Sequence, residues 1–244
     1  MNNNHLTRII KEITKFTVDE LKNKGLISLY LSGTILTKDR VEYSDIDLFG
    51  IVPPDFNIIE EENKINSEFK KRRKTLCGGF ETRFRAIGTD ELNKGKLRGI
   101  MAKYIGLNIL IKEFPFFKKL WGGDLDFSKF RVKPIKPKEE AKIYIKIIEN
   151  FMKKLKKGEE LFPIQNFPKS ILYLVRVEAE KDYNFKFNPY YVDLEKHLAK
   201  QKDHIVHKAM KLRHKKLKRK DILDFEEDIK KYLKHMKKRV KEWK

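Results

Sequence analysis

The hydrophobic pattern changes character near the middle of the chain, from mixed helical and strand spacings to helical spacing alone. Apolar residues over 5–23 recur every three or four positions and the pattern stops at Gly25, which predicts a helix. The apolar run at 26–31 and the segment 44–52, which ends before Pro53, are typical of buried strands. The chain is therefore expected to begin with alternating helices and strands.

The pattern continues with a polar helix over 57–74 and a third strand that follows the glycine pair at 78–79. Alternation along this strand divides its side chains into two sets, Phe80, Thr82, Phe84 and Ala86 on one face and Glu81, Arg83 and Arg85 on the other. Residues 89–120 predict helix interrupted at glycine and proline, followed by a turn at 121–124.

The second half is expected to be entirely helical. Two prolines among charged residues make 124–137 the best linker, Pro168 begins a helix, and the apolar positions of 222–243 predict one long amphipathic helix. The expected fold class is thus an α/β (α+β) domain with a small mixed sheet over residues 1–130, followed by an all-α helical bundle over 131–244.

The chain is strongly basic, with 56 Lys and Arg against 35 Asp and Glu and a formal net charge of +21. Residues 1–130 hold 23 basic and 18 acidic residues, whereas 131–244 hold 33 and 17, so the excess lies mainly in the second half. A positive field attracts polyanions such as nucleotides and RNA without choosing among them. A composition rich in Lys and poor in Gln is also typical of thermophilic proteins, so charge alone identifies no ligand.

The single cysteine, Cys77, excludes an intrachain disulfide and paired-cysteine zinc sites. The amino-terminal stretch mixes charged and apolar residues too closely for a signal peptide, and no run reaches the roughly 18 apolar residues of a membrane span. These observations predict a soluble, cytoplasmic protein with no membrane partner.

The residues with the most informative chemistry surround the second predicted strand. Asp45 and Asp47 are two apart, so their carboxylates project from one face while Ile46 turns into the core. Paired carboxylates repel each other unless a cation lies between them, and Mg²⁺ accepts one or two carboxylates together with substrate phosphates. Eleven residues before Asp45, Gly33-Thr34 is expected where a strand turns into a helix, where a glycine, a hydroxyl and free backbone N–H groups bind phosphate.

Glu81 is the third candidate. If its strand neighbours that of Asp45 and Asp47, Glu81 joins them over the same metal ions and can accept the proton of an attacking hydroxyl. Arg83 and Arg85 share its face, either to contact triphosphate oxygens or to restrain Glu81. The alternative is an exposed edge strand on which these residues form surface ion pairs of little energetic value. Thr34 likewise has an alternative role, as the cap of a short helix.

This constellation resembles the nucleotidyltransferase signature of the DNA polymerase beta superfamily, with Gly33-Thr34 in place of the usual glycine-serine pair and Asp45-Ile46-Asp47 after it. The layout of the whole chain is similar to the aminoglycoside adenylyltransferases, in which a catalytic domain precedes a helical domain. The resemblance implies catalytic, metal-binding roles for Asp45, Asp47 and Glu81 with two Mg²⁺ ions. It also implies nucleotide binding by Gly33, Thr34, Ser44 and Arg83, and transfer of AMP from ATP with release of pyrophosphate.

The sequence leaves the acceptor hydroxyl open. A small molecule fits the domain layout, a tRNA-like RNA 3′ end suits the charge, and a protein hydroxyl is the third choice; an RNA-binding protein without catalysis is the alternative class. Lys208–Lys220 places eight basic side chains in thirteen positions, enough for several phosphate contacts, although a solvated helical face is slightly favoured. His204 and His207 are expected to form a surface pair rather than a metal site, because no third ligand is evident.

Overall fold

The computed structural model describes residues 3–35, 37–42, 44–99, 107–126, 130–159 and 161–244. The chain divides into two compact units, residues 1–134 and 135–244. Among the described helices, none combines the length and the apolar character needed to span a membrane.

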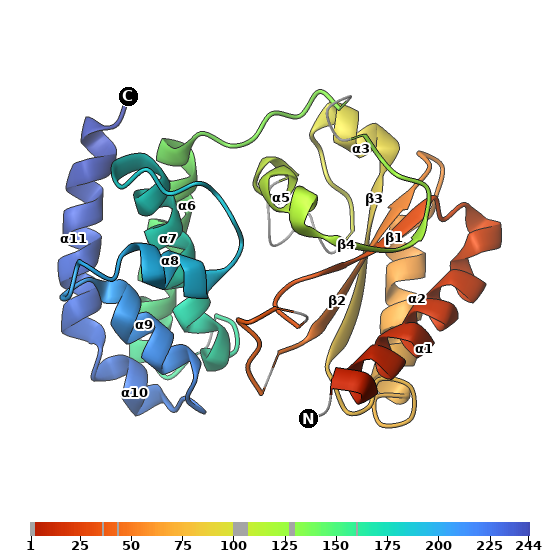
Figure 1. Ribbon diagram of the computed structural model, residues 1–244, viewed down its shortest axis with the longest axis horizontal. Coiled ribbons are helices and arrows are strands. Elements are labelled where there is room, and N and C mark those ends of the chain that lie inside the picture. The colour runs from red at the N-terminus through yellow and green to blue at the C-terminus, as the bar shows by residue number, and fades with distance from the viewer. Residues whose placement is uncertain (1–2, 36, 43, 100–106, 127–129, 160) are drawn as a thin grey trace. The chain divides into compact units, whose positions relative to one another are not determined.

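The first unit is built on a four-stranded mixed sheet of order β3-β2-β1-β4 (Figure 1). Its strands are β1 (Ser28–Ser32), β2 (Ile46–Val52), β3 (Thr82–Gly88) and β4 (Lys118–Gly122). β1 is antiparallel to β2 and to β4, whereas β2 and β3 are parallel. This parallel pairing brings the amino-terminal ends of β2 and β3 to one edge of the sheet.

Helices cover both faces of this sheet (Figure 1). They are α1 (Asn3–Leu21), α2 (Ile58–Lys71), α3 (Thr89–Lys94) and α5 (Leu107–Glu113), with short 3₁₀ turns η1 (Lys22–Lys24) and η2 (Phe114–Phe116). Because side chains alternate along β2, the strand contributes residues to the core on each face of the sheet. Ile46 and Leu48 join the core beneath α1 and α2. Phe49 and Ile51 pack with Leu110 of α5 on the other face.

Side chains of α2 protect the outer edge of β3. Asn66 Nδ2 donates to Phe84 O at 2.9 Å and Asn66 Oδ1 accepts from Phe84 N at 2.8 Å. The buried Glu62 accepts from Ala86 N at 2.8 Å. Because unpaired edge groups invite pairing with other chains, this covering stabilises β3 as the end of the sheet.

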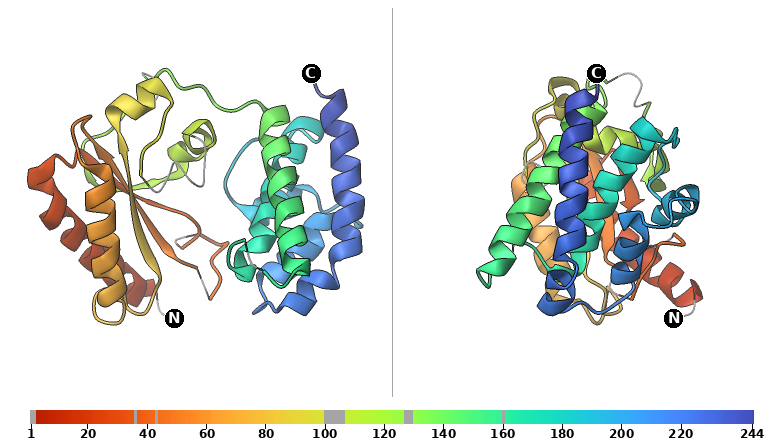
Figure 2. Two further views of the ribbon diagram at one scale, coloured as in Figure 1. Left: turned by 180° about the vertical axis from the view of Figure 1, so that it is seen from behind. Right: turned by 90° about the vertical axis from the view of Figure 1, so that its left-hand side faces the viewer.

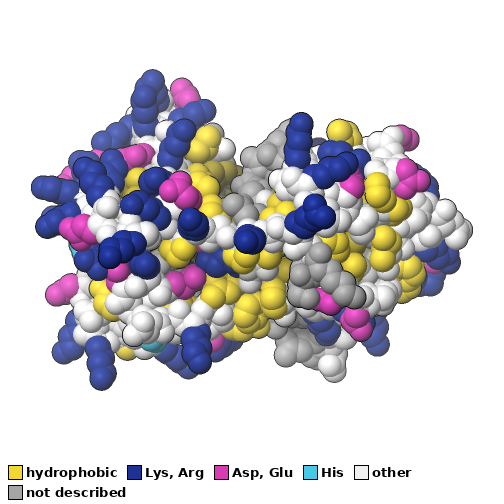
Figure 3. All heavy atoms as spheres, turned by 90° about the horizontal axis from the view of Figure 1, so that it is seen from above, with side chains coloured by type: hydrophobic (Ala, Val, Ile, Leu, Met, Phe, Trp, Pro, Cys, Tyr) yellow, Lys and Arg dark blue, Asp and Glu magenta, His cyan; other side chains and the backbone are white. Residues whose placement is uncertain are grey.

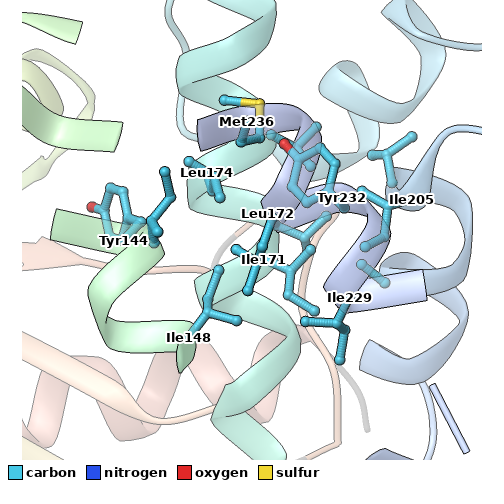
Figure 4. Close-up of a cluster of buried hydrophobic side chains, with 14 of the residues drawn as sticks. Tyr144, Ile148, Ile171, Leu172, Leu174, Ile205, Ile229, Tyr232 and Met236 are labelled. Atoms are coloured by element: carbon cyan, nitrogen blue, oxygen red, sulfur yellow. The ribbon is translucent and has the colours of Figure 1, made fainter. Parts of the chain in front are cut away.

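The second unit is helical, with α6 (Pro137–Lys156), η4 (Ile164–Asn166), α7 (Phe167–Asp182), α8 (Tyr191–His197), α9 (Ile205–Arg213), α10 (Arg219–Leu223) and α11 (Glu226–Glu242). In Figures 1 and 2, α6, α7 and α11 run side by side. The apolar stripes predicted from the sequence meet in one core, where Ile148 of α6, Leu172 of α7 and Ile229 of α11 lie together (Figure 4).

Three sequence expectations about elements were wrong. Residues 118–122 form β4 rather than the end of a helix followed by a turn; this edge strand carries exposed lysines instead of an apolar alternation. The predicted helix over 222–243 is divided at Asp224 and Phe225 into α10 and α11. No helix follows Gly33 within the described residues, where turns lead to β2 instead.

Candidate active site on strands β2 and β3

The parallel register of β2 and β3 brings the three predicted acidic residues to one edge of the sheet. Asp47 lies opposite Arg83, and Ile46 lies opposite Thr82. Ile46 N donates to Glu81 O at 2.8 Å, so the pairing extends to the residue before β3. Because side chains alternate along both strands, Asp45, Asp47, Glu81 and Arg83 share the face that also carries Phe49.

Two arginines of β3 contact these carboxylates. Arg83 Nη1 lies 3.5 Å from Asp45 Oδ2, and Arg83 Nε donates to Glu81 Oε1 at 3.1 Å, with a second, shorter bond from Nη2. Arg85 Nη2 lies 3.4 Å from Asp47 Oδ1. The Glu81 side chain is 55% exposed, whereas those of Asp45 and Asp47 are 18% and 16% exposed. Of the two roles expected for the arginines, restraint of Glu81 agrees with the bond between Arg83 and Glu81. Contact with triphosphate oxygens stays a prediction.

The pKa of the Arg83 guanidinium is affected by all three nearby carboxylates. Burial alone would lower the pKa of its guanidinium, but the hydrogen bond with Glu81 and the charges of Glu81, Asp45 and Asp47 outweigh burial and raise it. Arg83 therefore stays fully charged at any physiological pH and lies within the field of all three predicted acidic residues.

Gly33 approaches the carboxylate of Asp47 closely. Its φ of +82° lies in the left-handed region that favours glycine, and a Cβ added there would stand 3.4 Å from Asp47 Oδ2. The preceding Ser32 pairs with Asp47 in the β1–β2 register. The glycine predicted to approach a phosphate thus lies directly beside one of the predicted metal ligands.

The segment between Gly33 and β2 is organised by hydroxyl groups. Thr34 Oγ1 and Ser44 Oγ are 3.4 Å apart, and Ser44 Oγ also accepts from Val41 N at 2.9 Å. Thr37 Oγ1 donates to Thr34 O at 3.0 Å. Such side-chain bonds to nearby backbone groups compete with helix formation, which explains the turns found where a helix was expected. Among the described residues of this segment, Thr34 lies in a bend rather than at the start of a helix, and its hydroxyl lies beside that of Ser44.

The carboxylates of Asp45 and Asp47 suit a hard divalent cation, and an arginine lies beside each of them. Among the described residues, no three His, Cys, Asp or Glu side chains lie together closely enough to hold a metal ion. Asp45 and Asp47 remain a pair of oxygen donors on one strand face, which is what Mg²⁺ uses when substrate phosphates complete its shell. Glu81 is bonded to Arg83 and would have to leave it to join them.

The helical unit holds buried polar residues that the sequence did not reveal as a group. Glu178 is 2% exposed and accepts from Tyr232 Oη at 2.6 Å, with His204 Nε2 and His235 Nε2 each 3.3 Å from its carboxylate. The expectation of a surface histidine pair was wrong, because the His204 side chain is largely buried while His207 contacts Glu195. Nothing in the spacing of these residues along the chain indicates that they meet.

The basic segment Lys208–Lys220 is divided between α9, a connecting loop and α10. Arg213 is fully buried, with its guanidinium over the ring of Tyr191 at 5.0 Å, so it belongs to the interior. Lys208 pairs with Asp228. The exposed lysines of the segment that form no ion pair with other described residues are Lys211, Lys215, Lys216, Lys218 and Lys220. Figure 3 shows Lys and Arg side chains crowded over the helical unit, at left.

No family model matches this chain, and no curated protein matches it. Among solved structures, it is similar to spectinomycin adenyltransferase AAD(9) from Enterococcus faecialis, whose crystal structure was determined with ATP and spectinomycin. The similarity has a TM-score of 0.58 at 14% sequence identity, and it covers 98% of this chain and 100% of that chain. The chain therefore shares the fold of that adenyltransferase, a mixed sheet with its helices followed by a helical region, and this is the fold that the sequence resemblance predicted.

Proposed function

We propose that this protein transfers a nucleoside monophosphate from a nucleoside triphosphate to an acceptor hydroxyl, and that the transfer depends on Mg²⁺. The expected donor is ATP, so the group transferred would be AMP. The observation that carries the proposal is the placement of Asp45, Asp47 and Glu81 around Arg83 at one edge of the β2–β3 pair. The nucleotidyltransferase fold and the ATP in the similar adenyltransferase support the same reaction class.

In the proposed reaction the acceptor oxygen attacks the α-phosphorus while the bond from that phosphorus to the bridging oxygen breaks and pyrophosphate leaves. Asp45 and Asp47 would hold Mg²⁺, whose charge stabilises the phosphate oxygens and the departing pyrophosphate. Glu81 accepts the proton of the attacking hydroxyl, a role for which its exposed carboxylate is accessible. Gly33 lets a phosphate approach the backbone beside Asp47, next to the hydroxyls of Thr34 and Ser44.

Two classes of acceptor each have a supporting observation. The spectinomycin in the similar adenyltransferase favours a small hydroxylated molecule. The exposed lysines of the α9–α10 segment favour an RNA end, since several lysines close together in the sequence can contact successive phosphates. We favour the small molecule, because the fold similarity extends over the helical unit as well as the sheet.

The test is transfer of label from α-³²P-labelled ATP, CTP, GTP or UTP in the presence of Mg²⁺ with a metabolite extract, total RNA or the protein alone. We expect label in one acceptor fraction and release of unlabelled pyrophosphate. The double variant Asp45→Asn/Asp47→Asn should lose this release while keeping its melting temperature within a few degrees. Asp55→Asn, an exposed acid of the same unit, is the matched control and should retain activity. Unchanged pyrophosphate release in the double variant would refute the assignment.

A further inference from the structure

Two arginines already contact the predicted metal ligands. Arg83 reaches both Asp45 and Glu81, and Arg85 lies 3.4 Å from Asp47. A divalent cation bound by the two aspartates therefore has to share them with, or take them from, two guanidinium groups. The proposed function leaves this competition unexplained.

The net charge of this cluster determines how strongly it attracts a divalent cation. The three carboxylates carry −3 and the two guanidiniums +2, so the cluster has a net charge of −1. Arginine does not lose its proton in proteins, so both guanidiniums stay charged. A cluster this close to neutrality attracts a free divalent cation much less than three unpaired carboxylates would.

A triphosphate reverses this balance. It brings up to four negative charges, and a guanidinium binds phosphate as readily as carboxylate, through the same planar array of N–H donors. The two arginines are not equally placed to make the exchange. The Arg83 side chain is 36% exposed and that of Arg85 is 17% exposed, so Arg83 is the one with room to turn toward a ligand in solvent.

We propose that Arg83 is a positioning residue that makes divalent-cation binding depend on the nucleotide, an inference that rests on the function proposed above. Without nucleotide, Arg83 neutralises Asp45 and Glu81 and holds Glu81 away from the aspartate pair. A bound triphosphate takes Arg83 as a phosphate ligand, which frees both carboxylates for the cation and for the acceptor proton. Arg85 remains the fixed counter-ion of Asp47.

The experiment measures Mn²⁺ binding by electron paramagnetic resonance, with MnCl₂ alone and with α,β-methylene-ATP, whose α–β bridge resists transfer. Wild-type protein should bind Mn²⁺ weakly alone and about tenfold or more tightly with the analogue. Arg83→Gln should bind Mn²⁺ alone about tenfold more tightly than wild type and should lose affinity for the analogue. Arg83→Lys, which keeps the charge, should retain the weak binding of wild type.

Matched variants separate this inference from the function on which it rests. Arg8→Gln removes an exposed arginine that pairs with Glu12 on α1, so it changes the net charge equally and should leave Mn²⁺ affinity unaltered. Equal Mn²⁺ affinity of wild type with and without the analogue, or an Arg83→Gln affinity equal to that of wild type, overturns the role of Arg83 alone. Failure of Asp45→Asn/Asp47→Asn to weaken Mn²⁺ binding in the presence of the analogue overturns the metal site, and the proposed function with it.

Discussion

Arg85 on β3 contacts Asp47 on β2, although it lies two residues along β3 from the residue that pairs with Asp47. Asp47 has Arg83 as its Cα partner, yet its Oδ1 lies 3.4 Å from Nη2 of Arg85. Both side chains are largely buried, so each loses solvation that the contact between them helps to replace. The pair therefore links the proposed metal site to the stability of the sheet.

A double-mutant cycle on Asp47→Asn and Arg85→Gln should give a coupling energy of about 1–2 kcal/mol in the free energy of unfolding. Each single variant is expected to lose about 1–3 kcal/mol, because it leaves a buried partner poorly compensated. Denaturant unfolding monitored by circular dichroism gives the four stabilities. The exposed Arg8 and Glu12 pair on α1 is the matched control, and its cycle should fall below about 0.5 kcal/mol. A coupling that small for Asp47 and Arg85 would show the pair to be energetically unimportant.

Gly33→Ala should cost both stability and activity. Gly33 has a φ of +82°, where alanine is strained by about 1 kcal/mol, and the new Cβ would stand 3.4 Å from Asp47 Oδ2. We expect that methyl to obstruct the phosphate approach and to reduce pyrophosphate release at least about tenfold, a change of about 1.4 kcal/mol in the barrier.

Gly79→Ala provides the matched control for Gly33→Ala. Gly79 has a similar φ of +88°, but an added Cβ meets nothing within 4 Å. The two variants should lose similar amounts of unfolding free energy, whereas only Gly33→Ala loses activity. Equal activity in both variants would remove Gly33 from the nucleotide site.

The common face of the candidate acidic residues could be predicted because local spacing fixes it. Asp45 and Asp47 project from one face in any strand, and the alternation through Glu81, Arg83 and Arg85 fixes the polar face of β3. That β3 pairs in parallel beside β2 could not be read from spacing alone, although the family resemblance implied that their acidic residues converge. The ion pairs of Arg83 with Asp45 and of Arg85 with Asp47 depend on how β2 and β3 are aligned, and these segments are more than thirty residues apart in the sequence.

Elements whose character depends on distant partners were the ones that the sequence missed. β4 is a short edge strand with lysines at 118 and 119, and only its pairing with β1 identifies it as a strand. His204 follows charged residues in the sequence, yet its ring meets Glu178 from another helix. Local pattern describes a segment well where one face is apolar, and poorly where a buried polar contact holds it.

Asn66→Ala should destabilise the first unit by about 1–3 kcal/mol. Its side-chain amide satisfies both backbone groups of Phe84 at the outer edge of β3, at 2.9 and 2.8 Å, and alanine leaves both without that partner. Asn63→Ala, at an exposed position of the same helix, is the control and should change stability by less than about 0.5 kcal/mol. Thermal unfolding of the two variants compares them directly, and equal melting temperatures would contradict the edge-protecting role.

Tyr232 makes the stability of the helical unit depend on alkaline pH. Burial first, and then the negative charge of Glu178, which accepts its hydroxyl hydrogen bond at 2.6 Å, raise its pKa well above the ordinary value of 10.0. In the unfolded chain the same hydroxyl ionises near pH 10. Its contribution to stability is therefore complete below about pH 10 and is lost as the pH rises from there through the higher folded pKa.

Tyr232→Phe should make the free energy of unfolding fall less steeply above pH 10, by up to about 1.4 kcal/mol per pH unit, because one suppressed ionisation is removed. At pH 7 the variant should be less stable by about 1–3 kcal/mol, since the buried Glu178 loses a donor. Urea unfolding at pH 7 and at several values from 9.5 to 11 measures both effects. Tyr190→Phe removes a hydroxyl from a partly exposed tyrosine of the same unit and should keep the wild-type slope. A Tyr232→Phe slope identical to that of wild type would mean that the hydroxyl ionises in the folded protein as freely as in the unfolded chain, contrary to its buried position against Glu178.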